Sequence, residues 1–215
     1  LSKQFKNGMI PHMIYWEKPA TQKLHLSKIN WGGKDTSTIT QPPMLSYAVL
    51  EIFKHDDDKN FLEQIYSKVR KFYQYLILQR DPHHRNLTGI INPDESGEDN
   101  SPRFDSALEL SYKQTIEENF KKRLILIEKN KTCHFDAPRC MRNFFWVKDV
   151  PFNAIFIENL NCLAEIASIL GKDRDSEFFF KKAQDYKLAM RKLMLEDGIF
   201  WSTFGPDYLK IKVVT

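Results

Sequence analysis

Cysteine is scarce in this chain, and the few cysteines form no recognisable framework. The 215 residues include three cysteines, Cys133, Cys140 and Cys162, which is an odd number without the spacing of a disulfide scaffold. We therefore expect unpaired thiols in a reducing compartment, which favours a cytoplasmic location. Cys133 and His134 together with Cys140 suggest a metal site, but a fourth ligand at zinc-like spacing is missing. The sequence predicts no metal and no cofactor.

Long apolar runs and an excess of one charge are also missing. No stretch reaches the roughly 18 consecutive apolar residues of a membrane-spanning helix, and the chain begins without a signal-peptide pattern. The 32 basic and 28 acidic residues are well mixed and leave a net charge of +4, which argues against a nucleic-acid partner. Hydrophobic residues make up 42% of the chain, enough for one sizeable core.

What the chain does have is an unusually acidic stretch, residues 89–105. It holds five carboxylates between Asp94 and Asp105, with Arg103 as the single arginine. Glycines and prolines punctuate it, so it is predicted to be a loop. A carboxyl group crowded by other carboxylates holds its proton to higher pH, as a general acid requires. The alternative is an acidic surface turn; an EF-hand calcium loop is excluded because its alternating Asp/Asn spacing and closing glutamate are absent.

Four motifs in a fixed order resemble one family of enzymes. Residues 95–102 read Glu-Ser-Gly-Glu-Asp-Asn-Ser-Pro, which resembles the signature of the glycoside hydrolase family that holds mannosylglycerate hydrolases, bacterial α-glucosidases and the glycan-processing glucosidase. The related trehalase family carries a similar stretch. Residues 7–11, 40–43 and 147–154 match further motifs of the family in the expected order. The combination is far more specific than any one motif.

This resemblance implies glycoside hydrolysis with inversion on an α-linked glucoside, mannoside or mannosylglycerate-like substrate. Asp99 matches the family's general acid, while its general base is a glutamate that has no counterpart after Gly198. At position 94 some relatives have an aromatic residue, so Asp94 is a departure that affects the sugar subsite. The predicted substrate-binding residues are Gln41, Gly97, Trp31, Arg103, Asp105, Asp149 and Asn153.

The chemistry of some of these residues also indicates what they could bind, independently of the resemblance. The amide of Gln41, next to two prolines, can both donate and accept hydrogen bonds to a hydroxyl. Trp31 can stack on a sugar face or cover the edge of the core. Asp149 precedes a predicted helix, where its carboxylate either stabilises the helix N-terminus or meets substrate with Asn153. We expect Gln41 and Asp99 to line one pocket.

Apolar periodicity predicts an all-α fold of antiparallel helix pairs joined by long loops. Helical spacing is found over 44–54, 61–76, 102–112, 113–129, 151–170 and 179–193, and two short strands are expected at 197–201 and 208–214. The resemblance implies an (α/α)6 toroid, which needs twelve helices. We therefore expect residues 1–215 to form the N-terminal half of one catalytic domain, with no second domain. Its partners would be a small carbohydrate and a complementary C-terminal half, with no nucleic acid or membrane.

Several local expectations follow from the same patterns. Ser101 and Pro102 are predicted to begin a helix, and Glu95 is predicted to pair with Arg103. The basic residues 121–123 are interpreted as a solvated helix face. The alternative to an enzyme is a non-catalytic helical domain that binds a sugar or a partner chain with the same loops.

Overall fold

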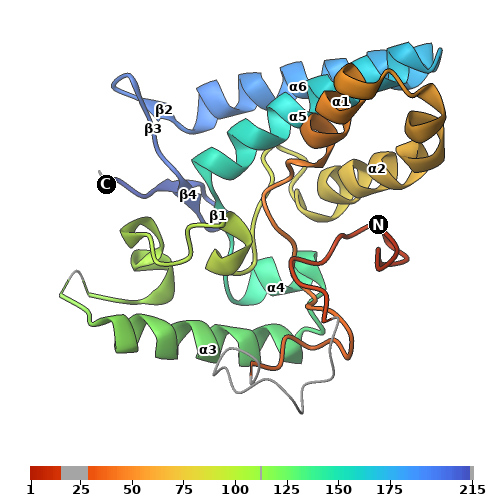
Figure 1. The fold of residues 1–215 in the computed structure, drawn as a ribbon. Coiled ribbons are helices and arrows are strands. Elements are labelled where there is room, and N and C mark those ends of the chain that lie inside the picture. The colour runs from red at the N-terminus through yellow and green to blue at the C-terminus, as the bar shows by residue number, and fades with distance from the viewer. Residues whose placement is uncertain (16–28, 112, 214–215) are drawn as a thin grey trace.

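The computed structural model describes residues 1–15, 29–111 and 113–213. Within these residues the chain forms six α-helices and a few two-residue strands, arranged as two layers (Figure 1). The upper layer in that view contains α1, α2, α5 and α6, and the lower layer contains α3. The helix bounds are Leu45–Asp56 (α1), Lys59–Gln79 (α2), Ile116–Thr132 (α3), Ala137–Asn143 (α4), Val150–Ile169 (α5) and Asp173–Leu193 (α6).

The first helical hairpin, α1 and α2, turns at the aspartates of residues 56–58. Asp57 adopts a left-handed conformation with φ of 51°. The Asp58 carboxylate then accepts hydrogen bonds from the backbone N–H groups of Asn60 and Phe61, at 2.9 and 3.2 Å. These are two of the N–H groups that a helix start leaves without an intrahelical partner. Asp58 is therefore the N-cap of α2.

The second hairpin, α5 and α6, contributes many residues to the main core. α5 is capped by the Asp149 carboxylate, and the hairpin turns at Gly171, where φ is +67°. Phe156 on α5 packs against Tyr186 on α6 with ring centroids 5.0 Å apart and against Tyr73 on α2 at 6.0 Å. Three helices from distant parts of the sequence therefore share one aromatic cluster, and this cluster fixes the upper layer.

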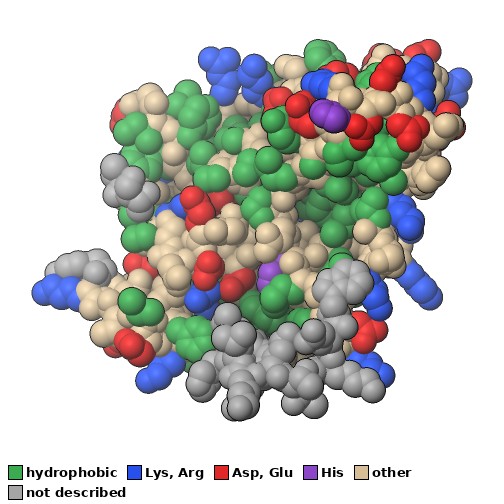
Figure 2. Space-filling model, viewed as in Figure 1, with side chains coloured by type: hydrophobic (Ala, Val, Ile, Leu, Met, Phe, Trp, Pro, Cys, Tyr) green, Lys and Arg blue, Asp and Glu red, His purple; other side chains and the backbone are tan. Residues whose placement is uncertain are grey.

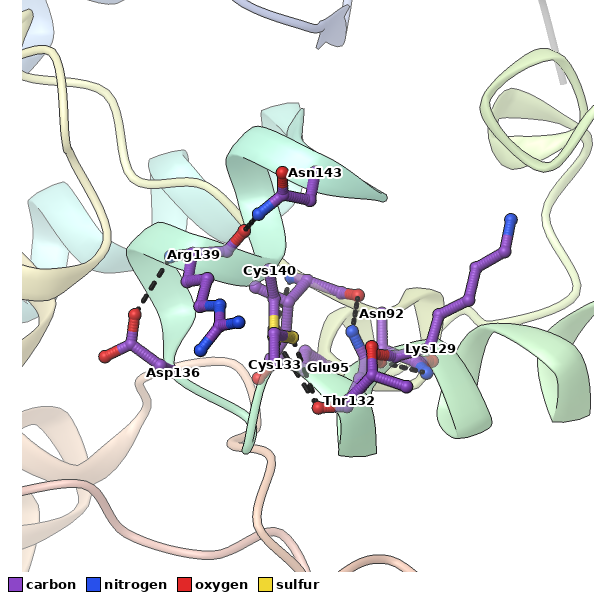
Figure 3. The surroundings of a disulfide bond; sticks show 11 residues. Asn92, Glu95, Lys129, Thr132, Cys133, Asp136, Arg139, Cys140 and Asn143 are labelled. Carbon is purple, nitrogen blue, oxygen red and sulfur yellow. Dashed lines mark hydrogen bonds between the residues drawn. A yellow bond between two sulfur atoms is a disulfide. The ribbon is translucent and has the colours of Figure 1, made fainter.

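The lower layer is held by a smaller apolar cluster and by a disulfide. The cluster packs the loop before α1 against α3 and α4; its buried members include Trp31, Ile39, Ile91, Ile127, Met141 and Trp146. Cys133, just after α3, is bonded to Cys140 on α4 (Figure 3). The prediction of unpaired thiols is therefore wrong for these two residues, because a tight turn after α3 brings them together. Cys162 is free and buried.

The strands form two small antiparallel sheets. β1 (Val147–Lys148), β4 (Thr203–Phe204) and β5 (Leu209–Lys210) lie in the order β1-β4-β5, and β2 (Leu195–Glu196) pairs with β3 (Ile199–Phe200). A small hairpin near the C-terminus is confirmed, formed by β4 and β5. The strand expected at 197–201 is β3, which pairs with β2 and not with the strand expected at 208–214. None of the helices in the described residues is both long enough and apolar enough to cross a bilayer.

The prediction of a helix that begins at Pro102 is wrong. Residues 102–108 form two short 3-10 turns, Pro102–Phe104 and Ser106–Leu108, and Glu109 ends them with φ of 57°. The Ser101 side chain makes no capping hydrogen bond and instead accepts one from Arg103. Phe104 and Leu108 are buried as their helical spacing suggests, so tertiary packing overrides the local preference for a helix.

The described surface leaves many large apolar side chains exposed, which generates a first prediction. On α6, Leu188 and Phe180 are 64% and 56% exposed, and further apolar side chains are exposed on α1, α2 and β3. On the face drawn in Figure 2, hydrophobic side chains lie among the polar ones. We expect the isolated chain to bind a hydrophobic dye and to self-associate. Dye fluorescence and light scattering measure this. A monodisperse monomer that melts cooperatively without binding the dye would contradict it.

Candidate active site

The acidic loop is fixed from beneath by a buried ion pair between Arg80 and Glu95. Arg80, which ends α2, donates from Nη1 and Nη2 to the two Glu95 carboxylate oxygens at 2.6 Å each. Its Nε donates to the Tyr75 hydroxyl at 3.0 Å. Burial lowers the pKa of Arg80, but Glu95 and Tyr75 raise it, and the net direction is upward. Arg80 therefore stays charged, and the predicted pairing of Glu95 with Arg103 is wrong.

Glu95 also organises the backbone around it. Its Oε1 accepts from the backbone N–H of Thr40 at 3.0 Å, and its Oε2 accepts from that of Ile91 at 2.8 Å. The carboxylate thus accepts four hydrogen bonds and has no exposed surface. One side chain joins the end of α2, the segment before α1 and the acidic loop.

The loop then turns sharply at Gly97, which brings it against the segment before α1. Residues Pro93–Ser96 form a 3-10 turn, and Gly97 follows with φ of 75°, a conformation that favours glycine. A β-carbon at Gly97 would lie 3.5 Å from Pro42 Cγ, so the two segments are in contact. Gln41 is exposed beside this contact, so two predicted sugar-binding positions lie close together.

Asp99 lies two residues further on, at a cavity of about 160 Å³ between the acidic loop, the N-terminal segment and α3. Asp99 Oδ2 accepts a hydrogen bond from Arg123 Nη1, and the Asp99 side chain is 35% exposed. Arg123 is only 11% exposed, so its interpretation as part of a solvated face is wrong. The cavity is lined by His12, Met13, Ile29, Trp31, Asp94, Asp99, Phe120, Arg123, Leu124 and Ile127. In Figure 2 acidic and basic side chains meet near the centre of the face shown.

Trp31 and His12 are two of the uncharged residues that line this cavity. Trp31 is buried in the lower core and meets the His12 ring edge to face, with centroids 5.1 Å apart. His12 Nδ1 is 2.7 Å from Ser37 Oγ. Burial lowers the pKa of His12 to about 4, although the charge of Glu95 acts in the opposite direction. His12 is therefore neutral near pH 7 and presents a ring without charge to the cavity.

Asp99 also lines a second, more open hollow of about 390 Å³, which is formed by residues 98–103. Arg103 is one of the residues that line this hollow. It donates from Nε to Asp149 Oδ1 at 2.7 Å, from Nη1 to Ser101 Oγ at 3.0 Å and from Nη2 to Glu98. Glu98 itself is 54% exposed. Arg103 thereby connects the acidic loop to the start of α5.

Asp149 is the buried end of that connection. Its Oδ2 accepts from the backbone N–H of Phe152 at 3.2 Å, and its Oδ1 also accepts from Ser202 Oγ at 3.1 Å. Burial raises the pKa of Asp149, and Arg103 opposes that rise. The helix-capping role of Asp149 is confirmed; its contact with substrate stays a prediction.

Asn153 and Asp105 are likewise engaged with the protein. The buried Asn153 amide holds Thr88, accepting from its backbone N–H at 2.8 Å and donating to its carbonyl at 2.9 Å. Asp105 accepts from Gln114 Nε2 at 2.6 Å. Both residues brace the segments that flank the loop, and neither lines the two hollows beside Asp99. Gln41 does not line them either, so the predicted common pocket of Gln41 and Asp99 is not formed by described residues alone.

Three functional candidates were missed in the sequence. Arg80 lies 15 positions before Glu95, Arg123 lies 24 positions after Asp99, and His12 lies 87 positions before Asp99. No short motif joins these residues to their carboxylates. A balance of charge offers the only signal, because a loop with five carboxylates and one arginine requires cations from elsewhere. Within the described residues, no group of three or more His, Cys, Asp or Glu side chains is placed to hold a metal ion.

This chain combines helical hairpins with a Glu-Ser-Gly-x-Asp loop at the ends of the helices. Its fold is that of a toroid-type glycoside hydrolase. The chain belongs to the mannosylglycerate hydrolase MGH1-like glycoside hydrolase family, whose domain model matches residues 1–204.

Individual relatives agree with this assignment. The chain is 28% identical over 204 residues to a mannosylglycerate hydrolase of Rubrobacter radiotolerans, covering 79% of this chain and 46% of that protein. It is 30% identical over 203 residues to a glucosylglycerate hydrolase of Mycolicibacterium hassiacum, covering 77% and 46%. A crystal structure of the GH63 mannosylglycerate hydrolase from Thermus thermophilus with glucose superposes with a TM-score of 0.81 at 26% identity, over 99% of this chain and 54% of that one. The chain thus spans about half the length of these relatives.

The buried ion pair yields the second prediction. Glu95→Gln leaves the Arg80 guanidinium buried without its counter-charge, so we expect the free energy of unfolding to fall by about 3–5 kcal/mol. Urea denaturation followed by circular dichroism measures this. Glu98→Gln, in the same loop but exposed, is the control and should change stability by less than about 1 kcal/mol. Equal effects of the two substitutions would show that the Arg80–Glu95 pair does not anchor the loop.

Proposed function

We propose that residues 1–215 provide the acid-bearing half of an inverting glycoside hydrolase. Its substrate is an α-linked glucoside or mannoside, with mannosylglycerate and glucosylglycerate as the first candidates. Support comes from the family and from relatives named for these two activities. The observation that carries the proposal is Asp99 itself, a half-buried carboxyl group between two hollows, on a loop anchored by the buried Glu95.

The chemistry assigned to Asp99 is proton donation. As the bond between the anomeric carbon and the glycosidic oxygen breaks, the Asp99 carboxyl proton passes to that oxygen. A second carboxylate, about 6.5–9.5 Å away, takes a proton from the water that attacks the opposite face of the sugar. The family's general base is a glutamate with no counterpart after Gly198, and we propose that a complementary C-terminal half of the barrel supplies it.

The remaining predicted site residues divide into two proposed roles. Gln41 and Gly97 are both exposed, and the Gln41 side chain and the Gly97 backbone are assigned to sugar hydroxyls, with Trp31 as the apolar wall. Arg103, Asp105, Asp149 and Asn153 already bind protein groups. Their assigned role is to hold the loop in position, with Arg103 also within reach of the open hollow.

Turnover with a stereochemical readout tests this proposal. Mannosylglycerate, glucosylglycerate and simple α-glucosides and α-mannosides are incubated with the chain alone and with the chain plus a complementary half, and proton NMR follows the anomer formed first. The β-anomer from an α-linked substrate, formed only when both halves are present, is the expected result. The α-anomer would refute inversion. Sugar binding without turnover in both preparations would favour the non-catalytic binding domain.

The third prediction concerns which carboxylate is the acid. In the active assembly, Asp99→Asn retains the side-chain shape but removes the transferable proton, so kcat on a substrate with a poor leaving group should fall about 10²–10⁴-fold. An activated aryl glycoside needs little protonation and should lose much less. Glu98→Gln should alter both rates by only a few fold. Near-normal hydrolysis by Asp99→Asn, with a loss in Glu98→Gln or in a folded Glu95→Gln, would transfer the acid role to another residue.

A further inference from the structure

Two carboxylates and one guanidinium meet at the mouth of the Asp99 cavity. A single atom, Nη1 of Arg123, donates both to Asp94 Oδ1 at 2.9 Å and to Asp99 Oδ2. We call Asp94, Arg123 and Asp99 the shared-arginine triad. With both carboxylates ionised its net charge is −1, so the triad can take up one proton and become neutral.

Asp94 is the more buried of the two carboxylates, with 19% of its side chain exposed against 35% for Asp99. Burial raises the pKa of Asp94, Arg123 opposes the rise, and the charge of Asp99 adds to it. Its second oxygen, Oδ2, is buried and has no hydrogen-bond partner among the described residues. A buried acceptor without a donor is costly, so Asp94 is ready to receive one more N–H group.

Arg123 is positioned to supply that group. Its Nε donates to Asn119 Oδ1 at 3.1 Å on the same helix, and its guanidinium lies 5.9 Å from the centre of the Phe120 ring. These contacts hold the stem of the side chain. A small rotation of the guanidinium can replace the hydrogen bond to Asp99 by a bidentate ion pair with Asp94. Arginine and a carboxylate commonly form this geometry.

This arrangement conflicts with general acid catalysis unless Arg123 moves. A hydrogen-bonded arginine favours the ionised form of a carboxyl group, whereas the acid must carry a proton when substrate is bound. We propose that Asp94 is a positioning residue: it draws Arg123 away from Asp99 so that Asp99 can take up the proton it donates. This inference rests on the proposed function of Asp99 as the acid.

The protons balance through one cycle. When Arg123 pairs with both oxygens of Asp94, Asp99 takes one proton from solvent, to which it is partly exposed, and the triad becomes neutral. Asp99 then gives this proton to the glycosidic oxygen, and Arg123 returns to share the two carboxylates. The only other titratable side chain that lines the cavity among the described residues is His12 on the N-terminal segment. Being neutral near pH 7, it adds no charge.

The experiment compares single and double substitutions in the active assembly. Asp94→Asn leaves Arg123 with only Asp99 to pair with, so kcat on an unactivated glycoside should fall about tenfold or more, with little change on an activated aryl glycoside. Adding Arg123→Gln should recover much of that loss, because the hydrogen bond from Arg123 to Asp99 is gone. Lys122→Gln, an exposed neighbour on α3 that pairs with Glu109, is the control and should leave both rates unchanged. A double variant no faster than Asp94→Asn, or equal losses on both glycosides, would overturn the proposal.

A measurement that needs no turnover separates this inference from the proposed function. Carboxyl-carbon NMR of the aspartates in the chain reports the pKa of Asp94 directly. Arg123→Gln should raise it and Asp99→Asn should lower it, because they remove an opposite and a like charge, respectively. If the protein hydrolyses no glycoside, the proposed function fails, while these two shifts still show the triad to be coupled. If hydrolysis is found but the pKa of Asp94 responds to neither substitution, the triad inference fails alone.

Discussion

A single buried ion pair sets the position of everything around the acidic loop. Arg80 and Glu95 lose nearly all contact with solvent, and a pair in that situation is tolerated only when its remaining hydrogen-bonding groups are satisfied. Tyr75, Thr40 and Ile91 satisfy them. Because these groups come from α2, the segment before α1 and the loop itself, the electrostatic requirement of one carboxylate fixes three segments in space.

The far side of the loop is fixed by a different connection, which begins at the N-terminus of α5. Asp149 caps that helix and binds Arg103, and Asn153 one turn later holds the backbone of Thr88. The loop is therefore attached to the upper helical layer at two places, while α3 closes the site from the lower layer (Figure 1). Asp99 lies between these anchors, where its surroundings combine solvent, one arginine and a second carboxylate.

Much of the fold and the position of the loop could be predicted because the responsible interactions are local. Apolar spacing along α1, α2, α5 and α6 reflects the 3.6-residue period of a helix with one buried face. Asp58 and Asp149 cap helices within three residues of their own positions. The toroid-type fold was implied by the order of four motifs, and the superposition on the GH63 mannosylglycerate hydrolase of Thermus thermophilus confirms it. The error over residues 102–112 arose where burial of Phe104 and Leu108 fits a helix and two 3-10 turns equally well.

The sequence by itself determined the approximate positions of α1, α2, α3, α5 and α6, the family, and which loop carries the acidic signature. Only the tertiary structure decided which charges pair. Glu95 pairs with Arg80 and not with Arg103, and Asp99 pairs with Arg123. The disulfide between Cys133 and Cys140 likewise depends on the tertiary structure. The physical reason is that a charge has no periodicity along the chain. Its partner depends on which side chains packing brings within about 4 Å, where an opposite charge and further hydrogen bonds offset the cost of leaving water. That geometry exists only once the two layers have packed.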